Sequence, residues 1–144
     1  MSGITPYLLF PGNAEEALGF YRSVFGGELR FNTFREFGRA DGPADAIAHG
    51  VLTGPVPLYG ADAGADEDAV HLSGMFLALL GTAEPAILHE WFDALGSDGR
   101  VLEPLDPRAW GAADGQLIDR YGVRWLVGYE GAVETGERYA PRAA

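Results

Sequence analysis

Apolar residues follow two different periods along the first part of the chain. Residues 4–10 form a short apolar run, which predicts a strand. In residues 14–25 apolar side chains recur every three or four positions, which predicts an amphipathic helix with acidic residues in its first turn. Asn13 can cap this helix by accepting a hydrogen bond from a backbone amide, and Gly26 and Gly27 end it.

Strand-like segments follow this helix. Three of them are rich in residues that favour strands, namely residues 28–37, 46–53 and 56–60. Together with the first strand and helix they predict one βαβββ unit, module 1, over about residues 4–60. The next segment, residues 61–72, is rich in Asp, Ala and Gly and predicts a linker. Its carboxylates, Asp62 among them, offer calcium ligands as an alternative, although their spacing does not resemble a calcium loop.

The same pattern returns in the second half of the chain. Residues 12–18 (GNAEEAL) match residues 81–87 (GTAEPAI), and the offset is 81 − 12 = 69 residues. We predict a strand, a helix and three more strands there, over residues 73–80, 83–95, 100–105, 116–119 and 124–129. Module 2 therefore covers about residues 73–130, and residues 131–144 form a polar tail. We expect the two modules to make one domain over residues 1–144.

Composition and charge exclude several classes of function. The chain has 144 residues and a formal net charge of −11, from 10 arginines and 21 acidic residues without any lysine. Nucleic acid and anionic lipid are poor partners for such a chain. Because there is no cysteine, disulfides, thiolate metal sites and a cysteine nucleophile are excluded. No secretory signal or membrane-spanning run of about 20 apolar residues is visible, so we expect a cytoplasmic protein without membrane contact.

Several motifs resemble those of the PhnB-like proteins. They include Pro6-Tyr7-Leu8, the segment from Gly12 to Ala17, Phe25-Gly26-Gly27, His49-Gly50-Val51-Leu52, and Trp110-Gly111 followed by Gly115, Asp119, Gly122 and Trp125. PhnB-like proteins belong to the vicinal oxygen chelate superfamily, with glyoxalase I, extradiol dioxygenases and bleomycin resistance proteins. The resemblance implies an α+β fold in which two paired βαβββ modules form an open, cup-shaped barrel with helices outside. It also implies a ligand cavity inside the cup and a homodimer.

Metal-dependent members of that superfamily place four ligands on four cavity-facing strands. By the resemblance these positions fall on Tyr7, Tyr59, Met75 and Leu126, none of which suits a hard or borderline divalent ion. A register slip of one residue substitutes other side chains that do not ligate metal either, namely Pro6 or Leu8, Leu58, Phe76, and Trp125 or Val127. We therefore predict no metal cofactor, with a divalent metal as the disfavoured alternative.

His49 is the strongest candidate for chemistry. Alternation in its strand puts His49 on one face and the small residues Ala48 and Gly50 on the other, where a helix can pack closely. Its imidazole could hydrogen-bond a ligand or move a proton as a catalytic group, or it could be satisfied by a neighbouring side chain. We expect His71 to lie in an exposed loop and His89 to face solvent from the second helix, so the three histidines do not gather as ligands.

The remaining candidates describe a largely aromatic and apolar lining. With His49, the same alternation predicts ligand contacts from Tyr7, Tyr59, Met75, Arg124 and Leu126. Trp110 lies in a long loop that could cover the mouth of the cavity, or it could instead fill a dimer interface or the end of the barrel. Arg124 is the fixed positive charge that could meet an acidic ligand, although an ion pair with Asp119 or Glu130 is an ordinary alternative.

Two functions follow from these observations. The first is a metal-free, homodimeric protein that binds a small organic molecule, in the manner of the bleomycin resistance proteins. The second is a metal-dependent or His49-dependent lyase, isomerase or dioxygenase acting on a small oxygenated substrate, with Glu36 and His71 as possible partners of His49 in a metal site. Exposed strand edges and the apolar residues Phe31, Phe34 and Phe37 are consistent with a dimer.

Overall fold

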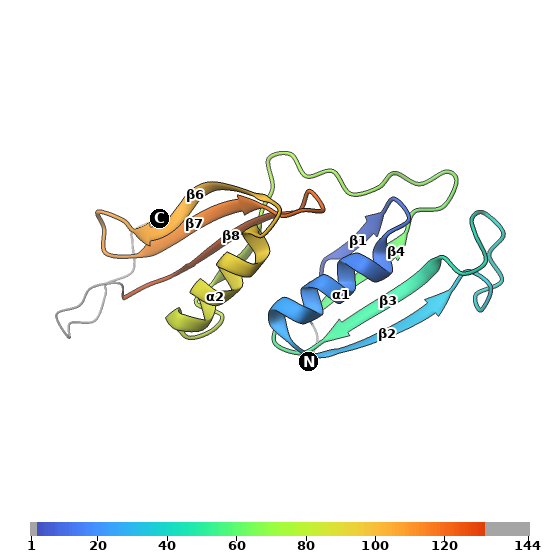
Figure 1. Ribbon diagram of the computed structural model, residues 1–144, viewed down its shortest axis with the longest axis horizontal. Helices are drawn as coiled ribbons and strands as arrows, with labels where there is room; N and C mark the ends of the chain where they lie inside the picture. Colours follow the sequence, from blue (N-terminus) through green and yellow to red (C-terminus); the bar gives the residue numbers. More distant parts are fainter. Residues whose placement is uncertain (1–2, 132–144) are drawn as a thin grey trace. The chain divides into compact units, whose positions relative to one another are not determined.

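A computed structural model describes residues 3–131 of the chain. The chain divides between Val70 and His71 into two compact units. Unit 1 contains β1 (Tyr7–Phe10), α1 (Ala14–Phe25), β2 (Glu28–Thr33), β3 (Ile47–Thr53) and β4 (Leu58–Asp62). Unit 2 contains β5 (Leu77–Leu80), α2 (Pro85–Gly96), β6 (Arg100–Pro107), β7 (Ala113–Ile118) and β8 (Arg124–Tyr129) (Figure 1). The predicted α+β class and the two βαβββ modules are confirmed.

The sheet of unit 1, sheet A, has the strand order β1-β4-β3-β2, with β1 parallel to β4 and the other pairs antiparallel. Helix α1 packs closely on one face of it because two glycines leave room. A Cβ added to Gly50 would lie 2.6 Å from Cδ1 of Leu18, and one added to Gly60 would lie 3.2 Å from the same atom. Since strand side chains alternate, the neighbours of these glycines point to the opposite face, which we call face A.

The sheet of unit 2, sheet B, repeats this arrangement with the order β5-β8-β7-β6. Helix α2 buries four large apolar side chains, those of Leu88, Trp91, Phe92 and Leu95. A Cβ added to Gly115 of β7 would lie 2.8 Å from Cε1 of Phe92, so Gly115 marks the side of the sheet that α2 covers. The opposite side of sheet B is face B.

The N-terminus of α1 is capped from another strand. The Asn13 side chain makes no cap hydrogen bond among residues 3–131, so the predicted cap is wrong. Instead the buried carboxylate of Asp62 accepts hydrogen bonds from the backbone amides of Ala14 (2.8 Å) and Ile47 (2.9 Å). Asp62 ends β4 inside the segment predicted as a linker. Both of its oxygens hold the fold of unit 1, which speaks against a calcium ligand here.

A second buried aspartate organises the β7–β8 hairpin of unit 2. Asp119 Oδ1 accepts hydrogen bonds from the backbone amides of Tyr121 (2.8 Å) and Val123 (3.0 Å). Its Oδ2 accepts one from Nε1 of the buried Trp125 (2.9 Å). Asp119 and Trp125, both part of the motif that resembles PhnB-like proteins, therefore stabilise the hairpin.

Strand β2 ends earlier than predicted because the chain turns at Phe34. Phe34 is fully buried, and the guanidinium of Arg39 lies 4.1 Å from the centre of its ring. Phe37, in contrast, is 52% exposed. Phe34 therefore belongs to the core of unit 1, and its apolar character is not evidence for the predicted dimer.

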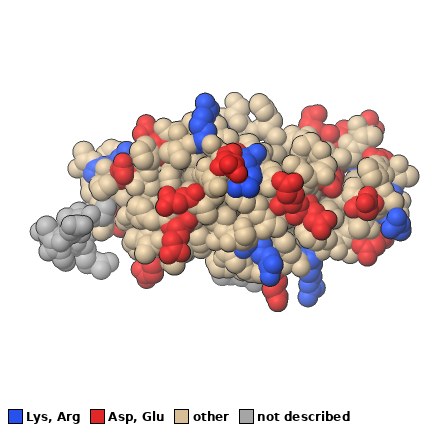
Figure 2. Space-filling view, in the orientation of Figure 1, with Lys and Arg blue, Asp and Glu red and all other residues tan. Residues whose placement is uncertain are grey.

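The face of the molecule shown in Figure 2 has no basic patch. Single arginines lie there among more numerous acidic residues. This distribution agrees with the chain's net charge of −11. Within residues 3–131, neither helix has the length and apolar character needed to cross a membrane.

Candidate functional site

Three rings from three strands lie together on face A. Tyr7 of β1 is the register partner of Tyr59 of β4, which in turn pairs with Val51 of β3, two residues after His49. The ring centres of Tyr7 and His49 are 5.6 Å apart, those of Tyr7 and Tyr59 5.9 Å, and those of His49 and Tyr59 5.7 Å. We call these three residues the aromatic cluster. All three are ligand contacts predicted from the sequence, and strand pairing brings them together.

A hydrogen bond orients the imidazole within the aromatic cluster. Tyr7 Oη lies 2.9 Å from His49 Nδ1, and the two rings are stacked with an angle of 28° between their planes. Partial burial, and secondly the negative charge of Glu67, raise the pKa of the Tyr7 hydroxyl, while Arg39 acts in the opposite sense. The hydroxyl therefore keeps its proton at neutral pH. When it donates that proton to Nδ1, His49 carries its own proton on Nε2.

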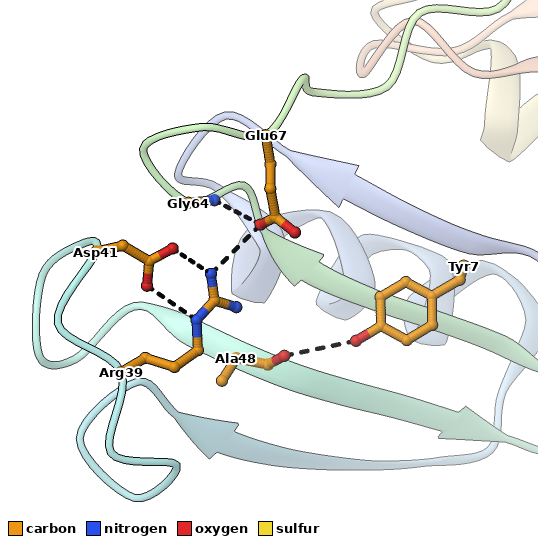
Figure 3. A network of polar contacts seen from close by, with 6 residues as sticks. All are labelled: Tyr7, Arg39, Asp41, Ala48, Gly64 and Glu67. Carbon is orange, nitrogen blue, oxygen red and sulfur yellow. Dashed lines mark hydrogen bonds and ion pairs between the residues drawn. The ribbon is translucent and has the colours of Figure 1, made fainter.

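Beyond the aromatic cluster, one ion-pair network joins two loops of unit 1 (Figure 3). Arg39 donates to both carboxylate oxygens of Asp41, at 2.9 and 2.6 Å, and lies 3.4 Å from Glu67. Glu67 also accepts a hydrogen bond from the amide of Gly64 (2.8 Å). The Arg39 guanidinium lowers the pKa of Asp41. The network was not predicted, since its members lie in segments without regular periodicity.

In unit 2, the candidates Arg124 and Leu126 lie on face B and are partly buried. The Arg124 guanidinium lies 4.5 Å from the centre of the Phe76 ring. Neither ion pair considered for Arg124, with Asp119 or with Glu130, is formed among the described residues. Met75 precedes β5 and is 53% exposed, so Phe76 rather than Met75 meets the neighbouring strand on face B.

Trp110 lies in the β6–β7 loop and is 43% exposed. It lines a cavity of about 330 Å³ within unit 2, together with Leu80, Gly81, Ala112, Ala113, Asp114, Tyr129 and Glu130. The loop is held by Arg108, whose Nε donates to Asp114 at 2.8 Å. Trp110 thus contributes an aromatic wall to a pocket of unit 2.

The other histidines lie outside the aromatic cluster. His71 is exposed between β4 and β5, as predicted. His89 is partly buried and its Nε2 lies 2.8 Å from the hydroxyl of Tyr129, so the prediction that it faces solvent is wrong. Glu36 is occupied at the end of β2, where it accepts a hydrogen bond from the amide of Thr33 (2.7 Å).

A family model for the glyoxalase/bleomycin resistance protein/dioxygenase superfamily matches residues 3–127. The chain belongs to this superfamily. The match spans both βαβββ units, which agrees with their being parts of one family domain. The predicted resemblance to PhnB-like proteins is confirmed as well, as the following relatives show.

The chain is similar to proteins from several bacteria. Protein YjdN of Escherichia coli (strain K12) is 27% identical over 138 residues, which cover 86% of this chain and 92% of YjdN. The crystal structure of protein PA1353 from Pseudomonas aeruginosa is 33% identical, with a TM-score of 0.72 and coverage of 90% of this chain and 98% of that one. A Bacillus cereus structure described as "putative 3-demethylubiquinone-9 3-methyltransferase, PhnB protein" is 26% identical, with a TM-score of 0.72 and coverage of 89% and 99%.

The residues at the superfamily's metal positions do not fit a divalent ion. Tyr7 is hydrogen-bonded to His49, and Tyr59, Met75 and Leu126 offer a phenol, a thioether and a hydrocarbon side chain. Among residues 3–131, no three His, Asp or Glu side chains come close enough together to hold a metal ion. We therefore derive no chemical step through a metal.

Proposed function

We propose that this superfamily protein binds a small planar organic molecule without a resident metal ion, and that the ligand lies against the aromatic cluster of face A. The observation that carries the proposal is the contact of Tyr7, His49 and Tyr59 on one sheet face. Tyr7 is 47% exposed and Tyr59 36% exposed. Two aromatic rings and an imidazole are thus held on rigid strands with part of their surfaces free for a ligand.

Stacking explains why this cluster suits a planar ligand. Aromatic rings prefer offset or edge-on contacts at the centre-to-centre distances already seen within the cluster, and a ligand ring can extend the same packing. The oriented imidazole adds one polar contact, through Nε2, that can select for a hydrogen-bonding group on the ligand. An apolar wall with few polar groups is typical of binding sites for small molecules.

The direct test uses indole as a neutral planar probe and follows the tyrosine ring signals by NMR. We expect indole to shift the signals of Tyr7 and Tyr59, and Tyr59→Ala to weaken binding about two- to tenfold. Phe37→Ala is the matched control, since it removes an exposed ring of unit 1 outside the cluster. Equal loss of binding in both variants, or no shift of either tyrosine, would overturn the proposed site.

The absence of a resident metal is tested by elemental analysis of protein purified without chelator, with thermal shifts on adding zinc, nickel or manganese. We expect substoichiometric metal and an unchanged melting temperature, because a ligand that binds only the folded state stabilises it. Stoichiometric metal together with a chelator-sensitive shift would instead favour a metal-dependent enzyme of the superfamily.

The Tyr7–His49 hydrogen bond favours a second candidate function, in which His49 moves a proton on a small oxygenated substrate as a lyase or isomerase. A general base needs an unprotonated nitrogen and a partner that fixes its orientation. Both are present in the tautomer in which Nδ1–H donates to the Tyr7 hydroxyl at 2.9 Å and Nε2 is free to accept a proton. Turnover of an oxygenated substrate that is lost in His49→Ala, while indole binding persists, would favour this function over simple binding.

We further propose that the chain forms a homodimer. Support comes from the resemblance to a superfamily in which homodimers are usual, and from the exposed Phe37 of unit 1. A cytoplasmic location stays a prediction from the sequence.

A further inference from the structure

Face B is apolar except for a few side chains, and one of these is Arg124. Gly115 and its register partner Val127 point toward α2, so the alternate residues of β7 and β8 point to face B. The side chains placed on this face by the strand register are those of Ala78, Leu80, Asp114, Gln116, Ile118, Arg124 and Leu126, with Phe76 beneath the guanidinium. Asp114 lies two rows from Arg124 and is paired with Arg108, so the immediate neighbours of the Arg124 cation on this face are the hydrocarbon side chains of Ile118 and Leu126.

Within the described part of the chain, Arg124 lacks an acceptor for its Nε–H. Its Nε is buried and has no hydrogen-bond partner within residues 3–131. Leaving a buried polar group without a partner is unfavourable, and more so when the group is charged. Other arginines show the usual alternative, since Arg39 and Arg108 are each paired with a carboxylate. The chain contains 21 acidic residues that could serve as acceptors. The missing acceptor at Arg124 Nε is therefore a specific feature of face B.

A second arginine lies in the same row of face B. Arg100 of β6 is the register partner of Ile118, and Ile118 is the register partner of Arg124. Residues in one row across three strands point to the same side, and two strand spacings separate the outer ones by about 10 Å. Glu103, opposite Gln116 on the edge strand β6, is the acidic residue of the next row. An anion is therefore drawn toward the β8 side of the face, where Arg124 lies.

We propose that face B binds the acidic group of a small organic anion, a carboxylate or phosphonate, through the guanidinium of Arg124. The planar guanidinium can donate two parallel hydrogen bonds to such a group from its two Nη atoms, and no carboxylate within residues 3–131 pairs with this charge. The hydrocarbon body of the ligand lies over the apolar residues Ala78 and Leu126 beside it. The inference rests on the proposed function as a small-molecule binder and names the chemical class of ligand.

The test compares three probes that share one ring. Benzoate and phenylphosphonate carry the acidic group, and benzamide is the neutral counterpart of benzoate. We expect at least one anion to bind the full chain about tenfold or more tightly than benzamide in calorimetric titrations, as for hydrogen bonds to a charged group. The two anions distinguish a carboxylate site from a phosphonate site.

Substitution of Arg124 then tests whether this residue causes the preference for the anions over benzamide. Arg124→Gln is expected to abolish the preference for the anion and leave benzamide binding unchanged, while Arg124→Lys retains part of it because a point charge cannot form the fork. Arg35→Gln is the matched control, since it removes the same charge from an exposed turn of unit 1. Equal binding of benzoate, phenylphosphonate and benzamide, or a preference that survives Arg124→Gln, would overturn the inference.

Two further readouts separate the possible failures. Indole binding that depends on Tyr59, without any anion preference, keeps the proposed function and rejects the role of Arg124. Benzoate or phenylphosphonate binding that is as strong in Arg124→Met as in the unmodified chain would also reject it, because methionine cannot donate a hydrogen bond to an anion.

Discussion

Tyr7 is the central residue of the candidate site of unit 1, because its hydroxyl orients the His49 imidazole. It contacts Nδ1 of His49 at 2.9 Å and lies 3.5 Å from the carbonyl oxygen of Ala48. Glu67 and Arg39, which belong to one ion-pair network, shift its pKa in opposite directions. Figure 3 shows the Tyr7 hydroxyl directed at the carbonyl of Ala48 and not at the ion-pair network, so the network acts on the phenol through its charges alone.

The raised pKa of Tyr7 makes the free energy of unfolding depend on pH, and the direction of the shift fixes the sign. The folded chain holds the Tyr7 proton more tightly than the unfolded chain, in which the pKa has its ordinary value of 10.0. The contribution to stability is therefore complete below pH 10 and is lost as the pH rises through the raised pKa of the folded state. We expect the free energy of unfolding, measured with urea, to fall above this pH less steeply in Tyr7→Phe. Identical slopes in the two proteins would contradict the shift.

At the scale of elements, two buried aspartates position the secondary structure of the two units. Asp62 joins the start of α1 to β3 and β4, and Asp119 closes the β7–β8 hairpin around Trp125. Each carboxylate accepts hydrogen bonds from backbone or indole N–H groups, which explains how these charges are tolerated in the interior.

The cap of α1 predicts a contrast between two substitutions. Asp62→Ala removes the acceptor of the amides of Ala14 and Ile47, and we expect it to lower the free energy of unfolding by about 2–4 kcal/mol. Asn13→Ala removes a side chain without a cap hydrogen bond, so its effect should stay below about 0.5 kcal/mol. Urea denaturation measures both. A larger effect at Asn13 than at Asp62 would show that the cap is assigned to the wrong residue.

The end of α1 predicts a second contrast, between two neighbouring glycines. Both have positive φ angles, 82° at Gly26 and 110° at Gly27. A Cβ on Gly26 meets no atom within 4 Å, whereas one on Gly27 would overlap the carbonyl oxygen of Thr53. We expect Gly26→Ala to destabilise by about 1–2 kcal/mol from backbone strain alone, and Gly27→Ala by about 1–3 kcal/mol more. Equal melting temperatures for the two variants would refute the close approach at Thr53.

At the scale of the whole molecule, the superfamily match over residues 3–127 and the internal repeat describe the same feature, a βαβββ unit that occurs twice. In each unit a helix covers one face of the sheet. The other face carries side chains that can bind a ligand or take part in a reaction. The aromatic cluster on face A and Arg124 on face B are such sets, so both units contribute a candidate binding surface.

The proposed homodimer makes a prediction for the whole chain. Light scattering coupled to size-exclusion chromatography is expected to give roughly twice the 15.4 kDa mass of the chain. Phe37→Asp places a charge on an exposed ring position and should shift the mass toward that of the monomer if Phe37 lies in the interface. A monomeric mass for the unmodified protein at micromolar concentration would reject the dimer.

Sequence patterns predicted the elements well wherever the periodicity was regular. The first helix was predicted over residues 14–25 and extends over Ala14–Phe25, and the second, predicted over 83–95, extends over Pro85–Gly96. Errors occurred at strand ends. Strand β2 was extended to residue 37, but the chain turns earlier because Phe34 enters the core and Glu36 binds the amide of Thr33.

The amino-acid sequence by itself determined the order of the helices and strands, the repeat, the family and the identity of the aromatic candidates. These depend on periods and motifs that follow the order of residues along the chain and need no knowledge of contacts between distant residues. Only the tertiary structure decided that Asp62 caps a helix 48 positions away and that Tyr7 meets an imidazole 42 positions away. It also decided that the Nε of Arg124 has no hydrogen-bond partner within residues 3–131. The reason is that strand register, which brings distant residues onto the same row and face, sets each of these contacts.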